Sequence, residues 1–256
     1  MTTQLHSPVR FLSRFVVLAT FCIAAPLFAD TPINAVPFTI SSPGRYFLAM
    51  NLNSNNSSKS AITIDADDVT IDFQDHSLTG GAGQGTNANG ITATNHRNIT
   101  IKNGTIHGFK TAIVLQRGFS SSTINNNANN VVQNMRLSWN TFGGILITDG
   151  TGCQIERCEI NRTGGTYTGV DAFGISLQFS SVVARHNQIS NVFATAGTSF
   201  GIVSNNSWAF LIDNQIETAV NGISVLGNSG QTKYRKNLTI NVPRPFNGGT
   251  DLGDNN

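Results

Sequence analysis

The side chains that could carry acid–base chemistry are few, and two small groups of them lie in the N-terminal third of the chain. The segment DFQDHS brings together Asp72, Asp75 and His76, and the acidic stretch DADD occupies residues 65–68. Hydrolysis of a glycosidic bond usually needs two carboxylates about 5–10 Å apart. Elimination beside a carboxylate needs a base and a neutralising cation. We interpret Asp72, Asp75 and His76 as structural, and residues 65–68 as a capped acidic turn rather than a Ca²⁺ site.

The histidines and cysteines do not form a recognisable metal or redox motif. His96 and His186 each stand alone without a second ligand at metal-binding spacing, so no metal and no cofactor is expected. Cys153 and Cys158 flank an extended segment, QIER, whose five residue steps span roughly 16 Å, too far for a disulfide. We expect two thiols packed inside the protein, and a bridge only if this segment is not a strand.

The N-terminus has the layout of a secretory signal peptide. Residues 1–29 carry Arg10 and Arg14, then an apolar run, then a small-residue end, which predicts cleavage before Asp30 and a secreted or periplasmic protein. The leader contains two of the 16 basic residues and none of the 14 acidic ones, which leaves 14 of each in the remainder. This neutral remainder gives no reason to expect a nucleic-acid partner. No later stretch is apolar enough to span a membrane.

A short motif recurs through the rest of the chain and predicts the elements that position these residues. Gly-Ile or Ala-Ile is followed by a polar turn, an alternating strand, a small or polar corner such as Asn103-Gly104, and another short strand. The isoleucines of successive copies are 21 to 32 residues apart: Ile62, Ile91, Ile113, Ile145, Ile175, Ile202 and Ile223. Three short strands per copy without helical periodicity predict coils stacked at the strand spacing of about 4.8 Å.

Two segments, AITIDADDVTIDFQDHSLTG and NITIKNGTIHGF, carry a resemblance to a known fold family. Over roughly residues 38 to 242, the chain resembles the right-handed parallel β-helix proteins of the pectin-lyase-like superfamily. The resemblance implies an all-β, single-domain protein (residues 30–256) of about seven coils, spanning about residues 60–242. A cap at 36–55 and a C-terminal seal at 243–256, with Pro243 and Pro245, are expected to cover its open ends.

The resemblance is specific for fold and leaves function open, because this superfamily includes lyases, hydrolases, esterases, epimerases, adhesins and inert scaffolds. The paired-Asp and Gly-His-Gly signatures of polygalacturonase-like hydrolases are absent, as is the Trp-Ile-Asp-His signature of pectate lyases. DFQDHS lacks the proline of the alginate-epimerase signature, and its Asp and His are shifted.

Stacking predicts ladders of like residues inside the coils and columns outside them. We expect one inward ladder from Ile91 to Ile223, and an asparagine-bearing corner of Cys158, Asn187 and Asn214. Phe173 and Phe200 are expected to stack on one another, with Phe142 nearby. A second inward ladder is expected from Ile106, Leu137, Ile160, Ile189 and Ile216. Solvated surface columns are expected from Lys102, Gln133, Glu156 and Arg185, and from Arg136 and Glu159.

The superfamily's catalytic residues usually lie on the outward face of the Gly-Ile strand. Alternation places one outward column there, in which Asp65 is the single charge: Asp65, Thr94, Gln116, Thr148, Gln178, Asn205 and Leu226. Loops at 117–130, 162–173 and 192–199 are expected to border this face and to wall a shallow cleft. The resulting ligand-binding candidates are Gln116, Arg117, Thr148, Arg162, Tyr167, Asp171 and Gln178.

These amides, hydroxyls and scattered charges suit binding of a glycan better than its cleavage. We therefore expect an exported, non-catalytic β-helix that binds a polysaccharide or cell-surface glycan. A polysaccharide lyase, hydrolase or epimerase remains the alternative, with Arg117, Arg162 and Asp171 as its loop-borne catalytic set. A structural or assembly protein is the third possibility. The sequence leaves the oligomeric state open.

Overall fold

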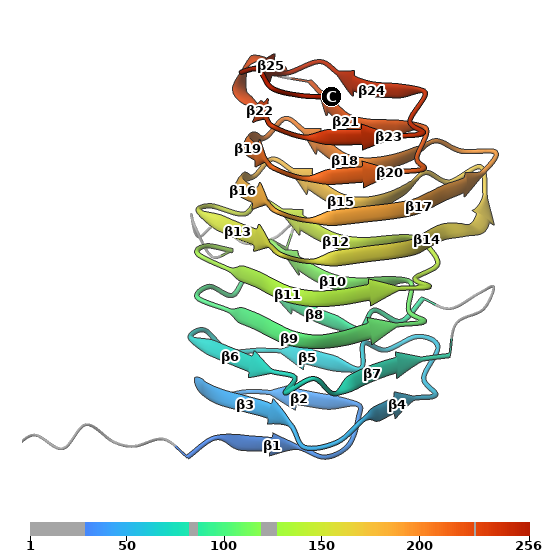
Figure 1. Ribbon diagram of the computed structural model, residues 1–256. Helices are drawn as coiled ribbons and strands as arrows, with labels where there is room; N and C mark the ends of the chain where they lie inside the picture. The colour runs from blue at the N-terminus through green and yellow to red at the C-terminus, as the bar shows by residue number, and fades with distance from the viewer. Residues whose placement is uncertain (1–28, 82–86, 119–126, 228) are drawn as a thin grey trace, which may run out of the picture.

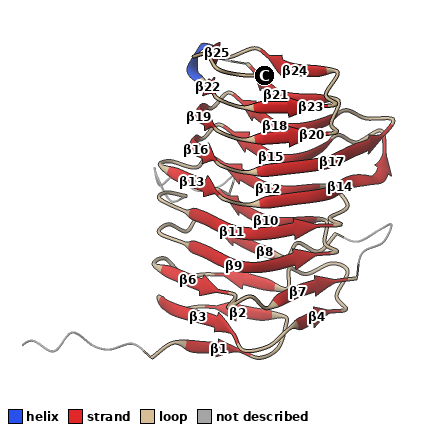
Figure 2. Ribbon diagram, viewed as in Figure 1, coloured by secondary structure: helices blue, strands red, loops and turns tan. Residues whose placement is uncertain are grey.

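The protein forms a stack of β-strand coils that rises from the N-terminus to the C-terminus (Figure 1). The computed structural model describes residues 29–81, 87–118, 127–227 and 229–256. Residues 1–28 of the expected leader lie outside the described residues. The stack has about seven turns, and its described residues are almost entirely strand and loop (Figure 2). Within the described ranges, no helix has the length and apolar character needed to cross a bilayer.

One wall of the stack is a nine-stranded parallel sheet, here called sheet B, which is built from the Gly-Ile strands. Its strands in spatial order are β2 (Phe38–Ile40), β5 (Ile62–Ile64), β8 (Ile91–Thr94), β10 (Thr111–Gln116), β12 (Gly143–Thr148), β15 (Ala172–Gln178), β18 (Ser199–Asn205), β21 (Asn221–Leu226) and β24 (Arg244–Asn247). Spatial order follows chain order because each coil adds one strand to the wall.

The other wall is a sixteen-stranded sheet, here called sheet A, to which most coils contribute two strand segments. The first segments are β1 (Thr31–Ile33), β3 (Gly44–Leu48), β6 (Val69–Asp72), β9 (Thr100–His107), β11 (Val131–Ser138), β13 (Cys153–Glu156), β16 (Ser181–Arg185), β19 (Trp208–Ile212), β22 (Lys233–Arg235) and β25 (Thr250–Asp251). The second segments are β4 (Leu52–Ser54), β7 (Ser77–Gly80), β14 (Glu159–Thr168), β17 (Gln188–Thr195), β20 (Gln215–Glu217) and β23 (Leu238–Ile240). In β9 and β11 the two segments join into one bent strand. The three expected strands per coil are therefore confirmed.

Both expected inward ladders are confirmed in register. Ile91 pairs with Ile113, and the pairing continues through every later Gly-Ile isoleucine to Ile223, each of them fully buried. The ladder from Ile106 to Ile216 pairs in the same way. Burying such a side chain contributes about 1.5–3 kcal/mol, so the stacked isoleucines are a main source of the fold's stability.

The bend in sheet A is made by left-handed residues, one per coil. Asn103, Asn134, Arg157 and His186 have φ values of 60°, 53°, 52° and 56°. The residue that follows each of them points inward, which explains why Gly104 follows Asn103: a side chain there would collide with Phe73 of the coil before it. Asn103-Gly104 is thus a corner, as expected.

The inside of this corner changes character along the stack. Met135 and Cys158 occupy it in the middle coils, and buried asparagines occupy it later. The Asn187 amide Nδ2 donates to Asn214 Oδ1 at 2.9 Å. Two residues that were not expected extend this ladder, since Asn214 donates to Asn237 at 3.0 Å and Asn237 donates to Asn255 at 3.1 Å. Asn255, the penultimate residue, therefore extends this ladder to the last coil.

Cys153 and Cys158 are free and buried, as expected. Burial raises the pKa of the Cys153 thiol to about 11 and that of Cys158 to about 12. Both thiols therefore stay protonated near neutral pH and behave as small apolar side chains.

At both ends of the stack, further parallel strands add to the two sheets. The expected cap at 36–55 consists of β2, β3 and β4, which lie in parallel register on β5, β6 and β7. At the other end, β24 pairs with β21, and β25 pairs with β22. Pro245 lies within β24, the last strand of sheet B. Proline lacks a backbone N–H, and at this outer edge its absence interrupts no hydrogen bonds to a further strand.

Two details differ from expectation. The segment 162–173 is not wholly a loop, because β14 extends to Thr168 and pairs with β17, with a register shift after Gly164. The segment 192–199 is likewise part strand, and the two segments form a paired extension on the right of Figure 1. The ring of Phe173 lies edge to face with that of Phe142, at 5.0 Å between centroids, although Phe173 and Phe200 are register partners.

Candidate functional site

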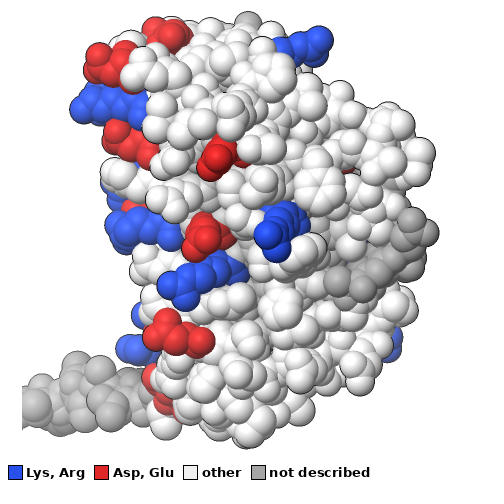
Figure 3. All heavy atoms as spheres, turned by 45° about the vertical axis from the view of Figure 1, so that its right-hand side comes forward, with Lys and Arg blue, Asp and Glu red and all other residues white. Residues whose placement is uncertain are grey.

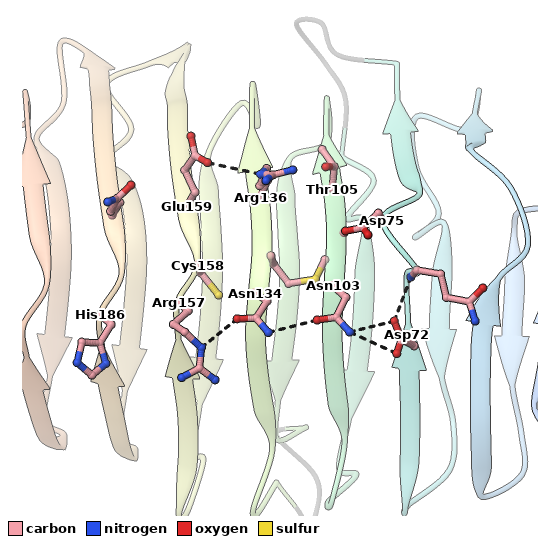
Figure 4. A pocket seen from close by; sticks show the side chains of 14 residues that line it. Asp72, Asp75, Asn103, Thr105, Asn134, Arg136, Arg157, Cys158, Glu159 and His186 are labelled. Atoms are coloured by element: carbon pink, nitrogen blue, oxygen red, sulfur yellow. Dashed lines mark hydrogen bonds and ion pairs between the residues drawn. The ribbon is translucent and has the colours of Figure 1, made fainter.

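A groove with a volume of about 700 Å³ runs along the bend of sheet A. Two columns of side chains form it. The left-handed corner residues line one side, and the first outward residues of the following strand segment line the other (Figure 4). The corner column is Asn103, Asn134, Arg157 and His186, and the second column is Thr105, Arg136, Glu159 and Gln188. Asp72, Gln74 and Asp75 line its N-terminal end.

A continuous row of hydrogen bonds connects the corner side chains across the coils. Asn103 Nδ2 donates to Asp72 Oδ1 at 3.2 Å, and Asn134 Nδ2 donates to Asn103 Oδ1 at 3.2 Å. Arg157 Nε then donates to Asn134 Oδ1 at 3.0 Å. A carboxylate can only accept and a guanidinium can only donate, so the two ends of the row fix both amides in one orientation (Figure 4).

Asp72 is an ionised anchor for this row. Partial burial alone would raise the pKa of its carboxyl, but hydrogen bonds from the Gln74 amide, Lys102 and Asn103, with the charge of Lys102, lower the pKa below its usual value. Lys102 Nζ lies 3.1 Å from Asp72 Oδ2. Asp72 is thus an acceptor near neutral pH and has no proton to give.

Glu156 anchors the row at its other end. Arg157 Nη2 lies 2.9 Å from Glu156 Oε1, and Arg185 Nη2 lies 2.7 Å from Oε2. Glu156, Gln133, Lys102 and Arg185 occupy one column, as expected. The expectation that Glu156 is solvated is wrong, because the two arginines leave its side chain only 8% exposed.

The outer polar side chains of the groove make longer contacts than Glu156 does. Arg136 Nε lies 3.7 Å from Glu159 Oε2, and both side chains are more than half exposed, so this pair adds little stability. His186 Nε2 lies 3.6 Å from Asp213 Oδ2 in the next coil. In Figure 3, charged side chains form an upright band over the left of the molecule, while much of the right is free of them.

The acidic turn at residues 65–68 has structural partners. His96 is not alone: its Nδ1 lies 3.1 Å from Asp67, and its Nε2 lies 3.3 Å from Asp65. These bonds and the ion pair of Arg97 with Asp67 hold the turn. Among the described residues, no group of three or more His, Cys, Asp or Glu side chains is placed to hold a metal ion.

The outward column predicted on sheet B forms in register, but its members do not line the groove. Gln116 pairs with Thr148, and Thr148 with Gln178. Gln116 Nε2 donates to Thr94 at 3.3 Å, and Gln178 Nε2 donates to Ser176 at 3.4 Å. Both amides therefore bond to neighbours on the outward face of sheet B. Their role in ligand binding stays a prediction.

Arg162 and Asp171 lie apart from this column. Arg162 lies over the ring of Trp139, 4.7 Å from its centroid, on the sheet A side. Asp171 accepts a hydrogen bond from the Thr198 amide and precedes β15, whereas Gln178 ends β15, about 23 Å of strand away. Arg117 follows Gln116 and donates its backbone N–H to Thr148. The side chain of Tyr167 and most of the loop 117–130 (residues 119–126) lie outside the described residues.

Sequence reasoning missed the groove because it treated the corner as architecture only. The signal was present in the sequence. Asparagine occupies the corner of two successive coils, at Asn103 and Asn134, and Arg136 and Glu159 each lie two residues after the corner of their own coil. Alternation predicted which residues point outward. It did not show that a left-handed bend would turn two outward columns toward one concavity.

Comparison with known proteins identifies the scaffold. A family model described as "Right handed beta helix region" matches residues 49–239, most of the chain. The chain belongs to the right-handed β-helix family. No curated protein and no solved structure matches it. The pectin-lyase-like superfamily is consistent with this β-helix assignment, and the site itself has to supply any argument about the ligand.

Proposed function

We propose that this β-helix protein is exported and binds a glycan without cleaving it, and that the glycan lies in the groove of sheet A. The observation that carries this proposal is the hydrogen-bonded row Asp72–Asn103–Asn134–Arg157. Its side chains are held in place before any ligand arrives, which lowers the entropic cost of binding.

The composition of the groove suits sugar hydroxyls, each of which both donates and accepts hydrogen bonds. Four side-chain amides, three carboxylates and two guanidinium groups lie along one open channel. From β6 to β16 the channel crosses four strand spacings of about 4.8 Å, or about 19 Å in total. An extended chain of sugars that runs along the stack matches this shape better than a compact ligand.

Binding without catalysis is favoured by how the carboxylates at the two ends of the row are occupied. Asp72 is ionised and already accepts hydrogen bonds from Lys102 and Asn103, while Glu156 is buried between two arginines. A general acid needs an available proton at working pH, which Asp72 lacks. These two carboxylates therefore serve as fixed acceptors.

An enzymatic role is the second candidate, favoured by Asp75 and Glu159 in the same groove. The loop set of Arg117, Arg162 and Asp171 is its other possible site, and an assembly role is a third candidate. Incubation of the full chain with a panel of polysaccharides, assayed for new reducing and unsaturated ends, separates these roles. Binding without new ends supports the proposal, and turnover that is lost in Glu159→Gln refutes it.

The groove is tested by a matched pair of variants. Asn134→Ala removes the middle of the row, whereas Gln154→Ala removes an exposed amide of sheet A that does not line the groove. We expect calorimetry on glycans found in the screen to show weaker binding for Asn134→Ala alone. Equal binding by both variants would exclude the groove.

Export is tested separately. The layout of residues 1–29 supports a mature chain beginning at Asp30. N-terminal sequencing of the exported protein is expected to start there, and an exported chain that keeps its leader would contradict this part of the proposal.

A further inference from the structure

Two aromatic rings stand exposed on the outward face of β19, one coil beyond the groove and five and three residues before the corner residue of that coil, Asp213. Trp208 is 63% exposed and Phe210 is 47% exposed, while Ala209 and Leu211 between and beside them are buried. Residues two apart on a strand lie about 6.6 Å apart on one face. Trp208 and Phe210, here called the aromatic shelf, therefore present two neighbouring rings to solvent.

The surroundings of the shelf combine an apolar wall with cations. Phe210 lines a hollow of about 230 Å³ together with Ile212, Lys233, Tyr234, Arg235 and Leu252. Lys233 is the register partner of Phe210, and Arg235 is that of Ile212. The ion pairs among the described residues include neither cation. Their N–H groups can therefore turn to a ligand.

The shelf adjoins the groove. Ile212 of the hollow directly precedes Asp213, whose carboxylate lies 3.6 Å from His186 at the end of the groove. Ile212 is also the register partner of Arg185, which bonds to Glu156. From β6 to β25 the combined surface crosses seven strand spacings, about 34 Å.

We propose that the aromatic shelf is a saccharide-stacking subsite that continues the groove, so that the ligand is a linear glycan long enough to occupy both. This inference rests on the proposed function. A sugar ring has an apolar C–H face and a polar rim. The face packs on an aromatic ring, and Lys233 and Arg235 donate hydrogen bonds to hydroxyl or carboxylate oxygens at the rim.

Comparison with the other exposed tryptophan supports this assignment. Trp139 is 54% exposed, but the Arg162 guanidinium lies over its ring at 4.7 Å. The ring and cation contacts recorded among the described residues leave Trp208 uncovered. A bare aromatic beside a hollow is typical of an interaction site.

The test compares short and long members of linear gluco-, xylo- and manno-oligosaccharide series, measured by calorimetry on the full chain. We expect affinity to rise with length until the groove and the shelf are both filled. Trp208→Ala with Phe210→Ala should weaken long-chain binding about tenfold, which is about 1.4 kcal/mol, and should leave short-chain binding unchanged. Trp208→Phe keeps a ring and should retain most of the affinity.

The controls separate this inference from the proposed function. Trp139→Ala removes an exposed tryptophan outside the shelf and should change nothing. If Asn134→Ala weakens binding while the double shelf variant binds long chains normally, the groove stands and the shelf is refuted. If neither variant changes the affinity, or if no oligosaccharide series is bound, both proposals are refuted.

A membrane surface is the other class of partner that exposed aromatics with cations can contact. Binding of the protein to vesicles of anionic phospholipid is therefore measured as the last part of the test. Vesicle binding that depends on Trp208 and Phe210, with unchanged glycan affinity, would overturn the saccharide subsite in favour of a lipid surface.

Discussion

Sheet A and sheet B both expose columns of polar side chains, but they present them differently. On sheet B, the side chains of Gln116, Thr148 and Gln178 stand on strands without an internal bend, and the two amides bond to neighbours on the same face. On sheet A, a left-handed corner turns two columns toward each other around an open groove. A bend, more than the chemistry of the column, decides where a repeat protein gains a concave surface.

The two faces also differ in how their polar groups are held. In the groove, charged residues at both ends fix the direction of the amide row. On sheet B, the Gln116 and Gln178 amides donate to the hydroxyl groups of Thr94 and Ser176, which carry no charge. Hydrogen bonds to charged groups are the stronger kind, so we expect the groove to be more rigid before binding.

The largest expected effect tests the core that both faces share. Ile175→Asp places an unpaired charge in the ladder behind sheet B, where Ile175 is fully buried between Ile145 and Ile202. Burial of an unpaired charge costs several kcal/mol, so we expect the protein to unfold or melt far lower. Unchanged thermal unfolding would refute the register on which the comparison of faces depends.

The next effect concerns the buried end of the amide row. Glu156→Gln keeps the shape of the side chain but removes the charge that holds Arg157 and Arg185, and we expect the free energy of unfolding to fall by about 1–3 kcal/mol. The control is Glu159→Gln, whose exposed pair with Arg136 at 3.7 Å should contribute under about 1 kcal/mol. Denaturant titration checks both, and equal losses would show that burial of Glu156 has no energetic consequence.

The sequence predicted the ladders well because a stacked repeat forces the same residue type to recur at the same place. Ile145 and Ile175 could be aligned by eye, and the structure pairs them. The groove could not be predicted in the same way, since it depends on φ at Asn134 and Arg157 and on the packing of Arg185 over Glu156. Alternation gives the direction of a side chain, but not the curvature of the surface beneath it.

A pair of amide variants compares the two faces directly. Asn134→Ala in the groove should weaken glycan binding by about 1 kcal/mol, the typical net contribution of one hydrogen bond. Gln178→Ala on sheet B should have the smaller effect if the glycan lies in the groove. Calorimetry with one glycan measures both. The reverse ranking would move the site to sheet B and restore the cleft predicted there.

The smallest expected effect is a pH dependence at the N-terminal end of the groove. Because the folded-state pKa of Asp72 is lowered below 3.8, its ionised form stabilises the fold above that pH, and this stabilisation is lost as pH falls below 3.8. Asp72→Asn removes the charge that Lys102 and Asn103 contact, so it should cost under about 1 kcal/mol near neutral pH, as for a partly exposed ion pair. The difference between the variant and the natural protein should shrink toward zero in acid. Urea titrations at neutral pH and below pH 3.8 measure this difference, with Asp75→Asn as the control from the same turn. A gap that stays constant with pH would show that Asp72 anchors the row by its shape and not by its charge, and would weaken the case for a charge-fixed groove.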